Sequence, residues 1–142
     1  MNREDFPMLN QDLIYLDNGA TTLKPKCVID SVVSYYSNYC ANAHRGDYSI
    51  SQKVDSMYEN VREKIKNFIH ANDSREIVFT SGTTDGLNRI VFGYFRKKLV
   101  EGDEVLITES EHASNVLPWF SLAKEKGIFV KYIPLDSHHE VT

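Results

Sequence analysis

The sequence is poor in cysteine, with Cys27 and Cys40 the only two among 142 residues. No second pair completes a zinc-type or CxxC spacing, so neither a metal site nor a disulfide framework is indicated. Both cysteines are therefore predicted to be free thiols. Only His44 among candidate bases is specified near them, so a role as nucleophile is disfavoured.

Long apolar runs are also missing from the sequence. No stretch approaches the roughly 18 apolar residues of a membrane helix, and residues 1–7 lack the apolar centre of a signal peptide. We therefore expect a soluble, cytoplasmic protein without a membrane partner.

The third absence is an excess of basic residues. Lys and Arg number 16 against 20 Asp and Glu, which gives a formal net charge of −4. Basic residues are scattered along the chain, so nucleic acid is a poor candidate partner. Hydrophobic residues make up 42% and aromatic residues 11% of the chain, which is typical of a globular fold with a core of its own.

The most informative segment is the loop at 81–86, Ser-Gly-Thr-Thr-Asp-Gly. It lies between a β-type run and a helical pattern, where free backbone N–H groups and the helix dipole stabilise an anion. Gly82 permits close approach, and Thr83 and Thr84 offer hydroxyl donors. Because no lysine follows and the nucleotide-loop motifs do not match, a monophosphate is favoured. The alternative is that Ser81 or one of the threonines merely caps the helix.

Periodicity and turn signals predict an alternation of helices and strands. In chain order they are an extended segment at 13–16, a helix opened by Pro25, a loop at 38–48, a helix from Ile50 to near 72–74, a strand at 76–80, a helix at 84–98 with apolar positions Leu87, Ile90, Val91, Tyr94 and Phe95, a strand at 104–108, a helix at 115–126 and a strand at 128–133. This order favours an α/β sheet with right-handed crossovers. Its last strand has an open edge, and we expect the chain to be cut short.

A second polar loop, at 108–115, follows the strand at 104–108. Ligands of open α/β sheets collect at the carboxyl ends of strands, so this loop and the loop at 81–86 could face one pocket. His112 would bring a flat, titratable ring to it. The alternative is a surface or capping histidine.

His44 and Arg45, within the loop at 38–48, add an imidazole and a cation suited to a carboxylate-bearing substrate. The alternative is a solvated turn. His138 and His139 have no metal-type spacing, and no metal is expected.

Four motifs in order carry a resemblance to a known family. They are Tyr15-Leu16-Asp17-Asn18-Gly19-Ala20-Thr21-Thr22 with Lys24-Pro25, then His44-Arg45-Gly46, then Ser81-Gly82-Thr83-Thr84-Asp85-Gly86, and last Glu111-His112 with Asn115 and Pro118-Trp119. Together they resemble the amino-terminal part of a cysteine desulfurase, nearest to the SufS/CsdA-like group of class V, pyridoxal-phosphate-dependent aminotransferase relatives.

The resemblance implies a fold and a domain organisation. The fold would be the amino-terminal part of the aspartate aminotransferase-like, fold type I architecture, α/β and incomplete. Residues 1–20 would be an extended N-terminal segment. Residues 21–142 would be a helical entry segment and the first part of the large domain that binds pyridoxal 5′-phosphate.

The resemblance also implies roles for individual residues. Gly82, Thr83 and Thr84 match positions that hold the cofactor phosphate, and His112 matches the catalytic imidazole that stacks on the pyridine ring. The substrate cleft would include Asn18, Ala20, His44 and Arg45.

The implied reaction converts L-cysteine to L-alanine and leaves sulfur as a persulfide on an enzyme cysteine. A sulfur-acceptor protein of the SufE/SufU type would take it on for iron–sulfur cluster assembly, and the full-length enzyme would be a homodimer. The Schiff-base lysine, the acidic partner of the ring nitrogen and the catalytic cysteine are expected after Thr142, so the chain alone is expected to be inactive. Alternatives are a non-catalytic, truncated phosphate-binding α/β remnant, or another class V enzyme such as selenocysteine lyase or kynureninase.

Overall fold

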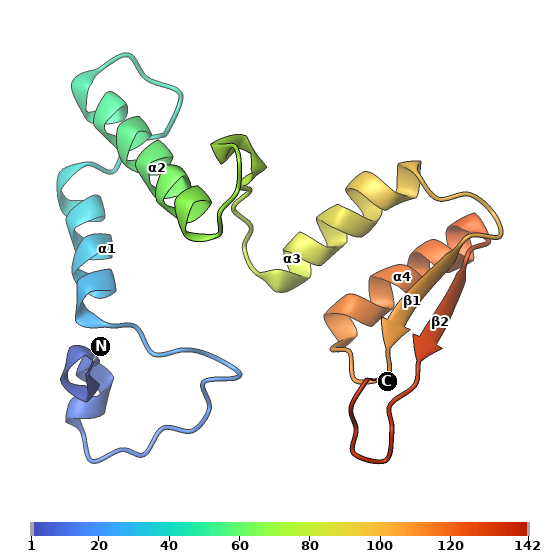
Figure 1. Ribbon diagram of the computed structural model, residues 1–142. Helices are drawn as coiled ribbons and strands as arrows, with labels where there is room; N and C mark the ends of the chain where they lie inside the picture. The colour runs from blue at the N-terminus through green and yellow to red at the C-terminus, as the bar shows by residue number, and fades with distance from the viewer. Residues whose placement is uncertain (1, 142) are drawn as a thin grey trace. The chain divides into compact units, whose positions relative to one another are not determined.

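The computed structural model describes residues 2–141 and has two compact units, Met1–Ile77 and Val78–Thr142 (Figure 1). No helix among the described residues combines the length and the apolar character needed to cross a membrane. The predicted division after residue 20 concerns the family's domain organisation and stays a prediction.

The first unit is helical. Its elements are short 3-10 helices at Arg3–Asp5, Pro7–Asn10 and Ser74–Glu76 and the longer helices α1, Lys26–Asn38, and α2, Ser49–Phe68. Pro25 precedes α1 with a φ of −68°, close to the value that the proline ring imposes and that a helix start accepts. The predicted helix after Pro25 is therefore confirmed, although no residue of α1 is buried.

Helix α2 ends earlier than the sequence pattern predicts. It stops at Phe68 because His70 adopts a left-handed conformation, with a φ of 57°. The Ala71 N–H then donates to the Lys66 carbonyl at 2.9 Å, the six-to-one bond of a Schellman ending. The predicted end near 72–74 was wrong. The left-handed position after a helix is usually a glycine, which can be recognised in the sequence, but here it is a histidine, His70.

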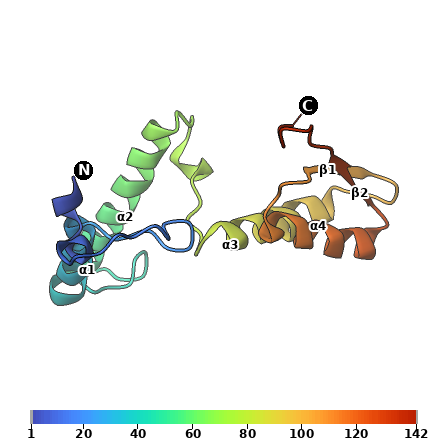
Figure 2. The same cartoon turned by 90° about the horizontal axis from the view of Figure 1, so that it is seen from below.

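The second unit contains the sheet. Strands β1, Glu104–Thr108, and β2, Phe129–Ile133, pair in parallel, from Glu104 beside Phe129 to Thr108 beside Ile133. Helix α4, Ala113–Lys126, connects them and lies along one face of the pair (Figure 2). Gly127 ends α4 in the left-handed region, with a φ of 70°, where a residue without Cβ is favoured. The predicted parallel α/β arrangement is confirmed here.

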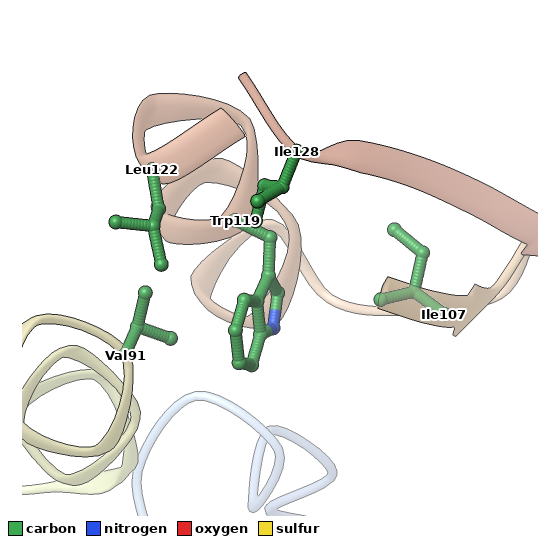
Figure 3. Packing of buried hydrophobic residues seen from close by; sticks show 5 residues of the cluster. All are labelled: Val91, Ile107, Trp119, Leu122 and Ile128. Atoms are coloured by element: carbon green, nitrogen blue, oxygen red, sulfur yellow. The ribbon is translucent and has the colours of Figure 1, made fainter. Parts of the chain in front are cut away.

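A small apolar core holds the second unit together (Figure 3). Its buried members are Val91, Ile107, Trp119, Leu122 and Ile128. The Phe95 ring meets the Trp119 ring edge-on, with centroids 5.3 Å apart, a favoured aromatic geometry. Arg96 and Glu125 form an ion pair at 2.7 Å beside this contact. The core therefore fixes α4 against both the strands and the helical segment that precedes β1.

The predicted strand at 76–80 was wrong. Residues 74–76 form a 3-10 turn, and residues 77–80 are not paired with another strand within the part of the chain that the structure describes. The Asp73 carboxylate accepts the Arg75 N–H at 2.8 Å, which stabilises a tight turn in place of a strand start. The described sheet therefore has two strands instead of the three expected.

The helix predicted at 84–98 exists, but it is not a uniform α-helix. It begins as α3, Thr83–Asn88, continues as a π-helix, Arg89–Tyr94, and ends as a 3-10 helix, Phe95–Lys97. A π-turn changes the hydrogen-bond spacing and with it the helical period. As a result Val91 is fully buried, whereas the predicted face members Ile90 and Tyr94 are 49% and 57% exposed.

The core predicts a strong difference between two leucines of α4. Leu122 is fully buried and Leu117 is 62% exposed. Leu122→Ala should lower the free energy of unfolding by about 2–5 kcal/mol, because it leaves a cavity in the core. Leu117→Ala, the same change on the same helix, should cost less than about 1 kcal/mol. Urea unfolding followed by the fluorescence of Trp119, the single tryptophan, measures both, and equal losses would contradict this description of the core.

Candidate functional site

A hollow of about 370 Å³ lies between two helices of the second unit. Its lining residues are Thr84, Asn88, Phe92, His112, Ala113, Ser114, Leu117, Pro118 and Ser121. The structure thus brings together two residues from separately predicted loops, Thr84 from the loop at 81–86 and His112 from the loop at 108–115. Its volume is within the range of pockets that hold small molecules.

Several lining residues were not identified from the sequence. Thr84 and Asn88 lie four residues apart on α3, and Phe92 of the π-helix that continues it lines the same hollow. On α4 Leu117 and Ser121 follow Ala113 at the same interval. These two stripes mix polar and apolar residues, so apolar periodicity alone does not reveal them, whereas mixed stripes that follow a polar loop at intervals of four do.

The loop at 81–86 leads directly into α3. Gly82 is the N-cap residue, and Thr83 and Thr84 are the first two residues of the helix. The N-cap makes no side-chain capping hydrogen bond, so the alternative of a Ser or Thr cap is not supported here. Instead the Ser81 N–H donates to the Asp85 carboxylate at 3.1 Å. The first-turn N–H groups of a helix have no partner further back in the same helix, so a ligand can accept from them.

Asp85 is the acidic residue of this loop, and its charge is compensated. Arg89 Nε donates to Asp85 Oδ1 at 2.7 Å, and Ser81 Oγ lies 3.3 Å from Oδ2. The Arg89 hydrogen bond, and after it the Ser81 N–H, hold the pKa of the Asp85 carboxyl below its ordinary value. Asp85 therefore stays ionised and paired, which reduces its repulsion of an anion at the helix start.

His112 is both a helix cap and a lining residue of the hollow. It is the N-cap of α4, and its Nδ1 accepts the Ser114 N–H at 3.1 Å. The sequence alternative of a capping histidine is therefore correct, and the same side chain also faces the hollow with Thr84. Capping limits the freedom of the ring, which suits a residue that must present one face to a ligand.

A chain of hydrogen bonds anchors the segment around His112. Thr108 Oγ1 donates to Glu111 Oε1 at 3.2 Å, and Asn115 Nδ2 donates to Glu111 Oε2 at 3.0 Å. Trp119 Nε1, in the core, donates to Asn115 Oδ1 at 3.3 Å. These contacts connect the end of β1 with the first turn of α4 and with the core. They therefore fix the backbone of His112, which lies between β1 and α4.

The proposed substrate-cleft residues lie in the first unit. Asn18 and Ala20 occupy an exposed turn, which Tyr15 closes by donating its hydroxyl to the Thr21 carbonyl at 2.7 Å. Asn18 also lines a second hollow, beside Tyr15.

His44 lies in the loop before α2 and contacts side chains of that helix. The exposed Arg45 follows it. The His44 N–H donates to Asp55 Oδ1 at 2.5 Å, and its Nε2 lies 3.4 Å from Glu59 Oε1. The next glycine, Gly46, has no room for a side chain, since a Cβ there would lie 2.6 Å from the Tyr48 ring. The loop is therefore attached to α2 and is not a freely solvated turn.

Neither cysteine is placed for metal or disulfide chemistry. Cys27 and Cys40 are exposed free thiols, as predicted. No cluster of three or more potential metal ligands occurs in residues 2–141.

Comparisons with known proteins identify relatives of this chain. Residues 14–142 match the family model described as aminotransferase class-V. A probable cysteine desulfurase of Vibrio cholerae is 43% identical over 97% of this chain. The apo structure of a cysteine desulfurase from Thermococcus onnurineus NA1 has a TM-score of 0.91 and 38% identity, over 98% of this chain and 34% of that one.

A more distant structure shares the fold alone. It is a mutant of C-DES with glycine covalently linked to its PLP cofactor, with a TM-score of 0.78 and 21% identity over 95% of this chain and 34% of that chain. The incomplete α/β fold predicted from the sequence is confirmed by these neighbours. The chain spans about a third of the length of the curated relatives it matches, 35% for the Vibrio cholerae protein. Since the family model covers all but the first 13 residues and the site-bearing loops fall within it, the chain belongs to the class V aminotransferase family.

Proposed function

We propose that this chain forms the phosphate cradle and the ring platform of a pyridoxal-phosphate-dependent cysteine desulfurase. The observation that carries the proposal is that Thr84 and His112 line one hollow, in a chain 43% identical to a probable cysteine desulfurase. A phosphate-binding loop and an imidazole at one hollow suit a flat, phosphorylated ring. Pyridoxal phosphate, when bound, supplies an electron sink for amino-acid chemistry.

The residues present fit this cofactor. Thr83 and Thr84 offer hydroxyl and backbone N–H donors at the start of α3, where an anion is stabilised. The apolar lining, Phe92, Leu117 and Pro118, suits the ring, and His112 would lie against it. Because Arg89 pairs with Asp85, the one carboxylate in the first turn does not oppose the phosphate with an uncompensated charge.

The reaction we propose is the conversion of L-cysteine to L-alanine, with sulfur retained as a persulfide. It requires a lysine, an acidic residue and a cysteine that we assign to the two thirds of the relatives' length that this chain does not span. Asn18, Ala20, His44 and Arg45 are proposed to contribute to the substrate cleft, on the strength of the family resemblance.

The wider setting is proposed on the same resemblance. The sulfur would pass to an acceptor of the SufE/SufU type and then to iron–sulfur cluster assembly, as in the SufS/CsdA-like group. The complete enzyme would be a homodimer in the cytoplasm.

The phosphate cradle can be tested with pyridoxamine 5′-phosphate, which has the ring and the phosphate but no aldehyde to react with surface lysines. Added to isotope-labelled chain, it should shift the amide signals of Thr83, Thr84 and His112. Thr84→Val should raise the Kd roughly tenfold, because a hydrogen bond to a charged group is lost. The matched control is Thr22→Val in the first unit, which should leave the Kd unchanged. Signal changes confined to other residues, or an unaltered Kd for Thr84→Val, would refute the proposed phosphate-binding site.

The Asp85 contacts predict a pH-dependent contribution to stability. The pKa of this carboxyl is lowered from 3.8 by Arg89 and Ser81, so its contribution is present above about pH 4 and disappears as the pH falls through the lower, folded-state pKa. Asp85→Asn should therefore destabilise the chain at about pH 6, and the difference from wild type should shrink below about pH 4. Urea unfolding followed by Trp119 fluorescence measures this difference.

The control for that experiment is Asp12→Asn, at an exposed carboxylate that makes none of these bonds. It should show neither the loss at about pH 6 nor the convergence at low pH. A difference between wild type and Asp85→Asn that stays constant over the whole pH range would contradict the assigned ion pair.

The division of catalytic residues predicts that this chain alone is inactive. Supplied with pyridoxal phosphate, L-cysteine and a thiol reductant that frees sulfide from a persulfide, it should release no sulfide beyond the background of the free cofactor, because no Schiff-base lysine or sulfur-accepting cysteine is assigned within it. The full-length probable desulfurase of Vibrio cholerae serves as the positive control. Sulfide release that rises in proportion to the concentration of pure chain would show that the assignment of the missing residues is incorrect.

A further inference from the structure

Both hydrogen bonds of the His112 ring in residues 2–141 go to one residue, Ser114. The Ser114 N–H donates to His112 Nδ1 at 3.1 Å, and Ser114 Oγ lies 2.5 Å from the same nitrogen. A backbone N–H can only donate, so Nδ1 must present a lone pair to it. In a neutral imidazole the proton is then on the other nitrogen, Nε2. In that tautomer the Ser114 hydroxyl also donates to Nδ1, so the N–H and the O–H share its one lone pair.

Other contacts around His112 act on the backbone and not on the ring. The Asn115 N–H donates to the His112 carbonyl at 2.8 Å, and Glu111 is bound by Thr108 and Asn115. These bonds fix where the Cα of His112 lies. They leave the rotation of the ring about its side-chain bonds, and the choice of tautomer, to Ser114.

We propose that Ser114 is a positioning residue that locks the His112 imidazole into one orientation and into its Nε2-protonated tautomer beside the hollow. The importance of this lock rests on the proposed function, in which His112 is the platform for the cofactor ring. A ring that is already oriented loses little rotational freedom when a flat ligand stacks on it, and its Nε2–H remains as a donor. Ser114 lines the same hollow, so the hydrogen bond between its hydroxyl and His112 lies within the site itself.

The test reads the imidazole nitrogens directly in the 142-residue chain without any cofactor. Long-range ¹H–¹⁵N correlation spectra of the labelled chain at about pH 8, where histidine side chains are ordinarily neutral, distinguish the two tautomers by their cross-peak pattern. The chain has five histidines, and His112→Gln identifies the signals of His112 by their loss. The expected result is a single Nε2–H tautomer for His112. A Nδ1–H tautomer or a mixture in the wild type would overturn the proposal.

Two substitutions then test the hydroxyl. Ser114→Ala keeps the N–H but removes the hydroxyl, so the His112 Nδ1 signal should move toward that of a nitrogen with fewer hydrogen bonds and the ring should become more mobile. Ser114→Thr, which restores a hydroxyl, should return both to the wild-type values. The matched control is Ser121→Ala, which alters a serine of the same hollow without a bond to His112 and should change neither. An unchanged Nδ1 signal in Ser114→Ala would overturn the proposed role of the hydroxyl.

The outcome is independent of cofactor binding. The tautomer is read from the wild-type spectrum, and His112→Gln serves only to identify which of its signals belong to His112. Failure of pyridoxamine 5′-phosphate to bind, with the Nε2–H tautomer present, would refute the proposed function and leave the Ser114 lock intact. Binding at Thr84 with a disordered or differently protonated His112 ring would refute the lock and leave the cofactor site.

Discussion

The packing of α4 in the small core is the constraint on which the site depends. Leu122 and Trp119 of α4 meet Val91 from the preceding helical segment and Ile107 from β1. This contact lays two helices side by side, and their facing stripes then enclose the hollow. Thr84 and His112 are 28 residues apart in the sequence. They line one hollow because the core sets the separation and register of the helices that carry them.

Hydrogen bonds connect the same core with the segment that carries His112. Trp119 contributes its ring to the core and its Nε1–H to Asn115, which in turn binds Glu111. A buried tryptophan needs a partner for its N–H, and here that partner belongs to the turn that carries His112. Burial of the indole therefore stabilises the core and orders the segment beside the hollow at once.

Charge at the start of α3 is arranged by local contacts. Asp85 stands in the first turn, where a carboxylate interacts favourably with the helix dipole. Its pairing with Arg89 and Ser81 turns a charge that would repel phosphate into part of the loop's internal structure. The backbone N–H groups of the same turn have no partner further back in the helix, and the proposed anion site uses them.

Local sequence signals determined much of this protein. The strand at 104–108, the glycine that ends α4 at Gly127 and the order of the four motifs predicted a member of an α/β family. The residue types at 81–86 and 108–115 predicted its two site-bearing loops. They were sufficient because turn residues, caps and strand periodicity act over a few neighbouring residues.

Tertiary structure alone decided three other features. Residues 77–80 have the composition of a strand, but strand pairing needs a partner and none is present among the described residues. The π-segment at Arg89–Tyr94 changes the buried face of its helix, and a fixed helical period cannot anticipate it. Thr84 and His112 line one hollow because the core packs α4 against the preceding helical segment. Residue types along the sequence name the groups that can form a site, and only packing and hydrogen bonds in three dimensions determine which of them meet.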